Sequence, residues 1–366
     1  MRSIPARCKL PDGEGAVAGR AGAAAATMLA GWNREKTGVR LHRGLLAWVG
    51  VVALFAGACR EETGYQPDRL EGFIGLVGAG PGDPLLPVLR AAAAVFQADT
   101  PGVSVRVAAP RRAAAADQAE VVHEWLAEGM RALCIQIIDP AASADLLATL
   151  RGSGVVVVTL VRRVESSPPF LHCGVDERAV GARLAAALAE QVPEDGTLGV
   201  VFASHDSTAR QRYEGFRAEI ARFPLLTVLR ELDCGGEADV AVRLMRETQS
   251  RFPGIDGWAA LDDWPVRGAA GEQPPLPPHC ALVIPGPVSD FETLLTTGRC
   301  RTIVMADYGE MLARALKACL LSLQEEVVYL RVYEAPLEPV TLRNLPAFAR
   351  RWAAWTAAPG AGRPAS

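Results

Sequence analysis

From Gly72 onward, short apolar runs alternate with helical stretches about every 30 residues, and this alternation limits the possible folds more than any other feature. Alternating strands and helices are typical of parallel sheets with right-handed crossovers. Nine strand-like runs exceed one mononucleotide-binding unit, so we predict an α/β fold with two Rossmann-like lobes, each with its own parallel sheet. The predicted strands are 73–77, 103–107, 132–137, 155–160, 198–202, 226–229, 257–261, 281–284 and 302–305, and the predicted helices are 85–96, 116–129, 141–151, 177–191, 208–222, 237–251 and 308–324.

The composition agrees with this fold class. Half of the 366 residues are hydrophobic but only 6% are aromatic, so the core must be mainly aliphatic, as in buried parallel strands covered by Ala-rich helices. The length fits about two domains. The formal net charge is −3, and no stripe of Lys and Arg with interleaved aromatic residues is present, which argues against a nucleic-acid partner. We expect a monomer.

The N-terminal segment has the features of an export signal. Residues 45–58 are apolar, follow a basic stretch and are too few for a comfortable membrane span. They end in Ala-Gly-Ala before Cys59, which resembles the lipobox of bacterial lipoproteins, although that motif usually has Leu at the position of Ala56. We therefore predict an extension with a signal peptide over 1–58, lipidation of Cys59 and a polar tether over 59–71. An ordinary cleaved signal, an uncleaved anchor and a buried helix remain alternatives.

Polar and charged residues follow several of the predicted strands. Ligands of open parallel sheets bind outside the carboxyl ends of the strands, so these positions are where a binding cleft would form. Polar loops are also expected on the surface of any α/β protein, so the pattern alone does not separate a cleft from a surface. The residues are Asp83, Asp139, Arg162, Arg163, Asp176, Ser204, His205, Asp206, Asp262 and Asp263.

The order of these motifs resembles that of the type I periplasmic binding proteins, in particular the ribose-binding branch. STARQRYEGF at 207–216, followed at the family's spacing by Leu-Asp-Asp at 261–263, is the most specific match. The resemblance implies lobes joined by a three-stranded hinge, with crossovers near residues 175, 305 and 335. The N-terminal lobe would comprise 72–175 with 306–334, and the C-terminal lobe 176–305 with 335–350. The other matching motifs lie at 73–92, 135–150, 155–163, 174–190 and 257–269.

The same resemblance implies ligand contacts. Arg162 and Arg210 fall where the family places arginines that fork onto substrate hydroxyls. Asp176 and Asp262 fall at polar contact positions, and Asp83 falls at an opening-loop contact. Arginines donate in parallel and carboxylates accept hydroxyls, so this set suits a hydroxyl-rich ligand. The alternatives are surface or interlobe charges for the two arginines, and helix caps for Asp176 and Asp262.

Other positions depart from the ribose-binding pattern. Leu85 and Leu86 replace aromatic residues that stack on the sugar, and Trp264 is the residue that can substitute from a neighbouring position. Val161 and Met305 stand at or beside polar positions of the branch. These departures weaken the case for a free sugar. The predicted ligand is a small polar molecule, sugar-like or related, and a pocket that no longer binds tightly remains an alternative.

No motif indicates an enzyme, a metal site or a cofactor. The dinucleotide fingerprint that would start at Gly78 fails at Asp83, the cysteines form no C-x-x-C pair, and the five histidines are spread along the chain. Cys134 fits a small buried hydrophobe. If the protein is exported, a disulfide could form among the cysteines at 173, 234, 280 and 300.

Together these features predict an extracytoplasmic, membrane-anchored lipoprotein that binds its ligand by hinge closure and delivers it to an ABC importer. The alternative is a sensing module that presents its closed form to a membrane receptor kinase. A repressor with the same lobes would need an N-terminal helix-turn-helix, where this chain has a signal-like segment. At the other end, we predict that Phe348, Trp352 and Trp355 form an aromatic patch on a lobe, and that residues 351–366 form a disordered tail.

Overall fold

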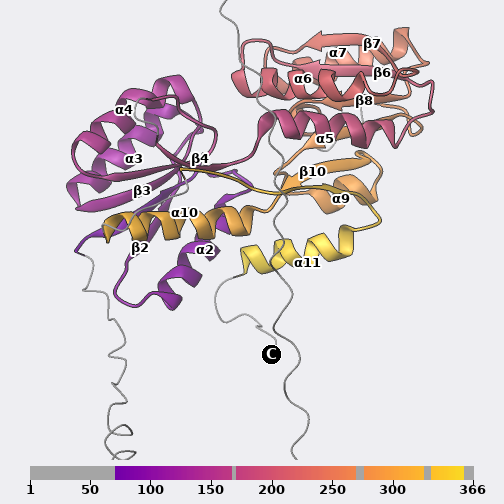
Figure 1. Cartoon of the computed structure of the whole chain (residues 1–366). Coiled ribbons are helices and arrows are strands. Elements are labelled where there is room, and N and C mark those ends of the chain that lie inside the picture. The colour runs from indigo at the N-terminus through magenta and orange to yellow at the C-terminus, as the bar shows by residue number, and fades with distance from the viewer. Residues whose placement is uncertain (1–70, 167–169, 269–275, 325–330, 358–366) are drawn as a thin grey trace, which may run out of the picture. The chain divides into compact units, whose positions relative to one another are not determined.

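The computed structural model describes residues 71–166, 170–268, 276–324 and 331–357, which form two six-stranded sheets (Figure 1). Neighbouring strands are parallel except for one antiparallel pair at the edge of the second sheet. In order, the first sheet contains β11 (Val332–Glu334), β5 (Leu171–Gly174), β4 (Val156–Val161), β3 (Met130–Gln136), β1 (Phe73–Val77) and β2 (Val105–Ala108). The second contains β12 (Leu337–Val340), β10 (Thr302–Ala306), β9 (Ala281–Pro285), β8 (Gly257–Ala260), β6 (Thr197–Phe202) and β7 (Thr227–Asp233). The predicted two-lobed α/β fold is confirmed, and the predictions for 1–58 and Cys59 lie outside the described residues.

The sheet of the N-terminal lobe is covered on both faces. Alternate residues of β1 enter different core clusters: Phe73 and Val77 pack with α3 and α4, whereas Ile74 and Leu76 pack in the cluster of α2 and α10. A strand buried on both faces needs apolar residues at every position, which is why β1 reads as a continuous apolar run. The helices are α2 (Leu86–Asp99), α3 (Ala115–Ala127), α4 (Pro140–Gly152) and α10 (Tyr308–Leu323).

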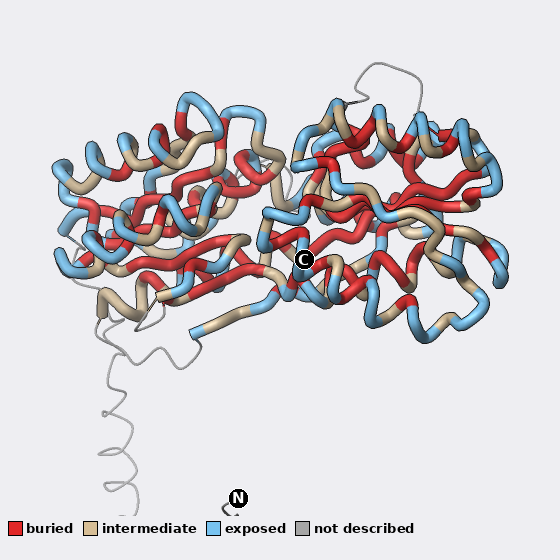
Figure 2. The backbone as a smooth tube through the Cα atoms, turned by 90° about the horizontal axis from the view of Figure 1, so that it is seen from above, coloured by how far each residue is buried: buried red, intermediate tan, exposed pale blue. Residues whose placement is uncertain are grey.

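The C-terminal lobe has the same layered arrangement, and buried residues run through the strands of both lobes (Figure 2). Its helices α5 and α6 cross at two glycines. A Cβ on Gly181 would collide with the carbonyl oxygen of Arg212, and a Cβ on Gly215 would collide with that of Arg178. This close approach fixes α6 against α5. The helices are α5 (Glu177–Ala189), α6 (Ser207–Ile220), α7 (Ala238–Arg251), α8 (Trp264–Gly268) and α9 (Phe291–Thr296). None of the helices in the described ranges is long and apolar enough to cross a membrane.

The chain passes between the lobes three times. It crosses from β5 to α5 at residues 175–176, from β10 to α10 at residue 307, and from β11 to β12 at residues 335–336. These are the three crossovers of the predicted hinge. One consequence is that each sheet receives its last strand, β11 or β12, from the end of the chain.

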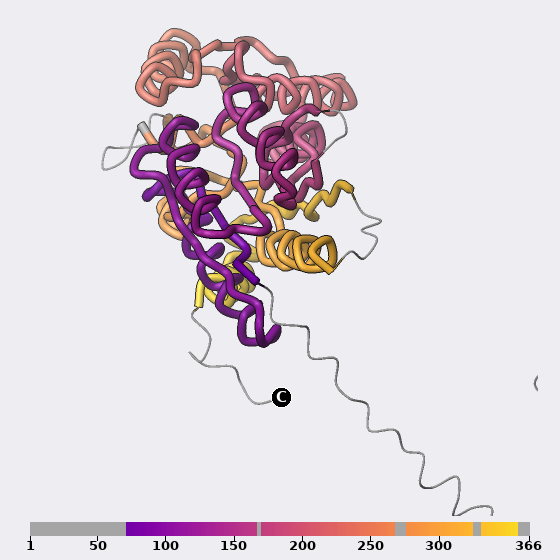
Figure 3. Tube along the Cα trace, turned by 90° about the vertical axis from the view of Figure 1, so that its left-hand side faces the viewer, coloured from indigo at the N-terminus to yellow at the C-terminus, as the bar shows by residue number. Residues whose placement is uncertain are grey.

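A C-terminal helix, α11 (Leu345–Thr356), packs on elements of both lobes. The Phe348 ring lies 5.3 Å from that of Phe291 in α9, the Trp352 ring lies 6.3 Å from that of Tyr308 in α10, and Figure 3 shows α11 next to α2. The predicted aromatic patch is therefore confirmed. The predicted disordered tail from residue 351 is wrong for residues 351–356, because Trp352 and Trp355 continue the helical stripe that starts at Phe348.

Candidate ligand-binding site

A cavity of about 460 Å³, here called the hinge cavity, is walled by residues of both lobes beside the first crossover. The N-terminal lobe contributes the start of α4, the segment after β4, and strands β5 and β11, while the C-terminal lobe contributes the first turns of α5 and α6. A ligand in this cavity would touch both lobes at once. Its polar lining residues are Arg162, Arg163, Glu165, His172, Asp176, Glu177, Ser207, Thr208, Gln211 and Glu334.

Arg162 reaches the cavity from a strained turn. The preceding residue, Val161, has φ 64°, and the N–H of Arg162 donates to the carbonyl of Leu160 at 2.7 Å. A β-branched residue with positive φ costs on the order of 1–3 kcal/mol, and such strain gathers at functional sites. Arg162 Nη1 donates to the carbonyl of Ile138 at 3.0 Å and lies 3.5 Å from Asp206 Oδ2 of the other lobe. A guanidinium has five N–H donors, so others remain for a ligand.

Asp176 and Asp206 cap α5 and α6, the two helices of the C-terminal lobe whose first turns line the cavity. Asp176 Oδ1 accepts hydrogen bonds from the backbone N–H groups of Arg178 and Ala179 at 2.9 and 3.2 Å, and Asp206 Oδ1 accepts from Ala209 at 2.9 Å. The capping interpretation of Asp176 is therefore confirmed. Since Asp176 also lines the cavity, the cap leaves its second oxygen available to a ligand donor.

Next to the cavity lies an ionic cluster in which the buried Arg212 and Glu177 are joined by the half-buried Asp262. Arg212 Nε donates to Glu177 Oε2 at 2.6 Å, and its Nη1 lies 3.8 Å from Asp262 Oδ1. Burial alone would lower the pKa of Arg212, but the charges of the two carboxylates outweigh it and raise that pKa. Glu177 Oε1 is buried, lines the cavity through its residue, and has no hydrogen-bond partner among the described residues. A buried carboxylate oxygen needs a donor, and a ligand hydroxyl could supply one.

The opening loop walls a second cavity of about 490 Å³, which also involves both lobes. Asp83 lies in its wall and holds the loop, since its carboxylate accepts from the backbone N–H groups of Ala79 at 3.2 Å and Leu85 at 3.0 Å. Asp263 of the C-terminal lobe lines the same cavity. Burial, followed by the charge of Asp262, raises the pKa of Asp263 to about 6, although Arg267 opposes the shift.

The structure does not bring all predicted contacts together. Arg162 and Asp176 both line the hinge cavity, and Asp83 lines the second cavity. Asp262 is half-buried against Arg212, and Arg210 is exposed on α6 and lines neither cavity.

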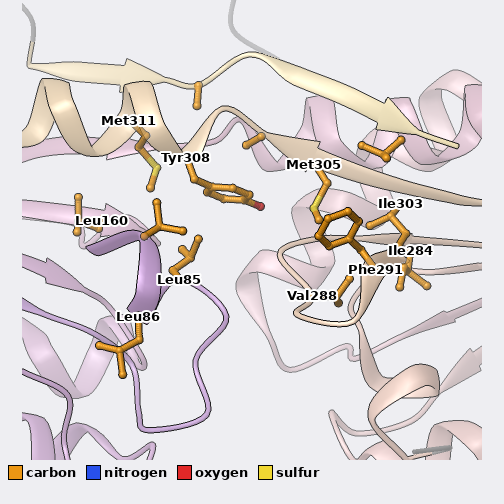
Figure 4. Close-up of a cluster of buried hydrophobic side chains, with 14 of the residues drawn as sticks. Leu85, Leu86, Leu160, Ile284, Val288, Phe291, Ile303, Met305, Tyr308 and Met311 are labelled. Carbon is orange, nitrogen blue, oxygen red and sulfur yellow. The ribbon is translucent and has the colours of Figure 1, made fainter. Parts of the chain in front are cut away.

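Two further predicted contacts are buried in an apolar cluster that spans both lobes. Leu85 and Trp264 are 1% and 3% exposed, respectively. Figure 4 shows Leu85 next to Tyr308, whose ring reaches toward Met305 of the other lobe. In this conformation, the leucine, tyrosine and methionine side chains belong to one apolar cluster that spans both lobes.

The sequence did not identify Arg212, Glu177 or His172 as residues in or beside the binding site. A signal for Arg212 was available: it lies three residues after Ala209 and four before Phe216, on the buried stripe of α6, whereas Arg210 points away from that stripe. His172 had no such signal. Burial, and next the charge of Arg163, lower its pKa to about 4, so the ring is neutral near pH 7 and its Nδ1 pairs with the Thr159 hydroxyl at 2.9 Å.

Residues 74–272, more than half of the chain, match the family described as the periplasmic binding protein domain. The chain belongs to this family. The predicted resemblance to type I periplasmic binding proteins is thereby confirmed. Membership implies an extracytoplasmic location and a role in binding. No curated protein matches the sequence of this periplasmic binding protein.

Solved structures with the same fold share little sequence with this chain. An ABC transporter periplasmic solute binding protein from Actinobacillus succinogenes with bound D-allose is 16% identical with a TM-score of 0.66, and the match covers 76% of this chain and all of that one. An arabinose binding protein from Geobacillus stearothermophilus is 17% identical with a TM-score of 0.67, covering 76% and 99%. A myo-inositol binding protein from Caulobacter is 18% identical with a TM-score of 0.62, covering 76% and 95%.

Proposed function

We propose that this periplasmic binding protein captures a small hydroxyl-rich ligand, sugar-like or related, in the hinge cavity and delivers it to an ABC importer. The observation that carries the proposal is the cavity wall, in which Arg162 of one lobe has N–H donors while Asp176 and Glu177 of the other lobe have acceptor oxygens. Donors and acceptors on opposite walls match a ligand whose hydroxyls do both. The fold neighbours that bind D-allose, arabinose and myo-inositol support this class of ligand.

The mechanism that we propose is hinge closure. A ligand that contacts both lobes stabilises the closed form over the open one by its differential affinity for the two forms. The Arg162–Asp206 ion pair joins the lobes at the same place, and its side chains are 28% and 23% exposed. A partly exposed pair of this kind contributes about 1 kcal/mol or less. The pair would therefore orient Arg162 without holding the lobes shut, and closure would depend on the ligand.

The expected result for the correct ligand is a rise in Tm of about 5 °C at a concentration 100 times its Kd. We would screen D-allose, arabinose, tagatose, myo-inositol, nucleosides and amino acids by differential scanning fluorimetry. Titration calorimetry should then show that Arg162→Ala weakens binding about 10–150-fold, because a charged hydrogen bond to the ligand is lost.

Arg210→Ala is the matched control, since it removes the same side chain from an exposed position outside the cavity. Its affinity should equal that of the wild type. If no compound on the panel raises the Tm, ligand capture is rejected. If Arg162→Ala binds as tightly as the wild type, the hinge cavity is not the binding site.

We further propose that Cys59 carries a lipid that anchors the protein to the membrane. The support is the Ala-Gly-Ala-Cys sequence after an apolar run, and a diacylglycerol on the cysteine sulfur would hold the binding lobes near an importer. Growth with a labelled fatty acid should label the wild type but not Cys59→Ser, and the variant should leave the membrane fraction. Equal labelling of both proteins would exclude this anchor.

A further inference from the structure

Three buried cysteines of the N-terminal lobe converge where α10 covers the sheet. Cys134 lies on β3, Cys173 on β5 and Cys319 on α10. The sulfur atoms of Cys134 and Cys319 are 3.3 Å apart, and both residues are fully buried. Among the described residues, these are the only two cysteine thiols in hydrogen-bonding contact with each other. Cys280 and Cys300, by contrast, contact backbone carbonyl or amide oxygens.

Two independent sequence patterns, one in β3 and one in α10, explain why these thiols face each other. Cys134 shares a face of β3 with Ala132, and that face packs in the cluster that contains α10. Cys319 continues the buried stripe of α10 formed by Leu312, Ala315 and Leu316. The contact therefore follows from the register of the strand and the phase of the helix, and it joins residues 185 positions apart.

We propose that Cys134 and Cys319 form a disulfide in the exported protein. Sulfur atoms in a disulfide are about 2.05 Å apart, and the two sulfurs here are already in contact at 3.3 Å. Each thiol gives up one hydrogen, and the two electrons and two protons pass to the disulfide of a thiol oxidant of the extracytoplasmic compartment, which becomes a dithiol. Both cysteines lie in the N-terminal lobe, so the bond fastens α10 to its sheet and leaves the hinge free.

The bond must form before α10 docks on the sheet. The contact with Cys319, together with burial, raises the pKa of Cys134, so the folded protein holds it as an unreactive thiol. In the folded protein both sulfurs are also out of reach of an oxidant, since both residues are 0% exposed. Oxidation therefore takes place outside the cytoplasm while the chain is still folding. Once the chain has folded, burial protects the disulfide from reductants.

Mass spectrometry of the exported full chain tests the proposal directly. The protein is denatured with an alkylating reagent and no reductant, then digested. We expect a linked pair of peptides that contain Cys134 and Cys319 and are two hydrogen atoms lighter than their sum. Alkyl groups on both cysteines in most of the protein, or a bond from Cys319 to Cys173 instead, would overturn the proposal.

Thermal unfolding supplies the second measurement. A bond that closes so long a loop should make the Tm about 5–10 °C higher in the exported protein than in protein refolded with a reductant. Cys319→Ala should abolish this difference. Cys300→Ala removes an equally buried thiol outside the pair and should retain it. A wild type whose Tm is the same with and without reductant would contradict the bond.

Discussion

Replacing Arg212 with methionine should lower the free energy of unfolding by about 3–5 kcal/mol, because the substitution leaves Glu177 and Asp262 without their cation. Glu177 is only 8% exposed, so water cannot replace the lost guanidinium. The carbonyl of Leu261 also loses its donor at 2.9 Å. Urea unfolding followed by circular dichroism measures the change.

Arg210→Met provides the control, since it makes the same chemical change two residues away on the exposed side of α6. Its stability should stay within about 0.5 kcal/mol of the wild type. Adding Glu177→Gln to Arg212→Met should recover part of the loss, because it removes the stranded charge. Equal losses for Arg210→Met and Arg212→Met would show that α6 is not placed as described.

Phe348→Ala should lower the free energy of unfolding by about 3–5 kcal/mol, as expected for a buried phenylalanine. The ring is 1% exposed, packs edge-on against Phe291 and lies beside Trp352 and Trp355. Its loss leaves a cavity under α11 that neighbours from both lobes can fill only in part. Urea unfolding again provides the measurement.

Leu342→Ala is the matched comparison for that experiment, because Leu342 precedes the same helix but is 57% exposed. It should cost less than about 0.5 kcal/mol. A cost below 1 kcal/mol for Phe348→Ala would mean that α11 is not part of the folded core, and the original expectation of a disordered end from residue 351 would regain support.

The layers of the fold were predictable because they depend on short-range patterns. Continuous apolar runs such as 73–77 and 281–284 became buried strands at nearly the predicted positions. Strands β5, β11 and β12 were missed. Each has three or four residues and carries no apolar run of its own, so its extended conformation comes from pairing with a strand that is already buried.

The site was predicted only in part, for a different physical reason. Arg162 directly follows β4, which was a predicted strand, and the carboxyl ends of parallel strands face the cavity in this fold. The directions of helical side chains and the fit between lobes depend on packing that no single segment specifies. The family pattern therefore selected Arg210 rather than Arg212, and it selected Leu85 and Trp264, which the interlobe apolar cluster buries.

Because each sheet takes its final strand from residues 332–340, neither lobe can be completed until the chain has been synthesised past these residues. The N-terminal lobe remains incomplete until α10 and β11 have been synthesised, and these elements follow most of the C-terminal lobe in the sequence. Pairings between such distant residues form slowly. For a protein that works beyond the cytoplasm, this delay is useful, since a nascent chain without finished domains can still be threaded through a translocation channel.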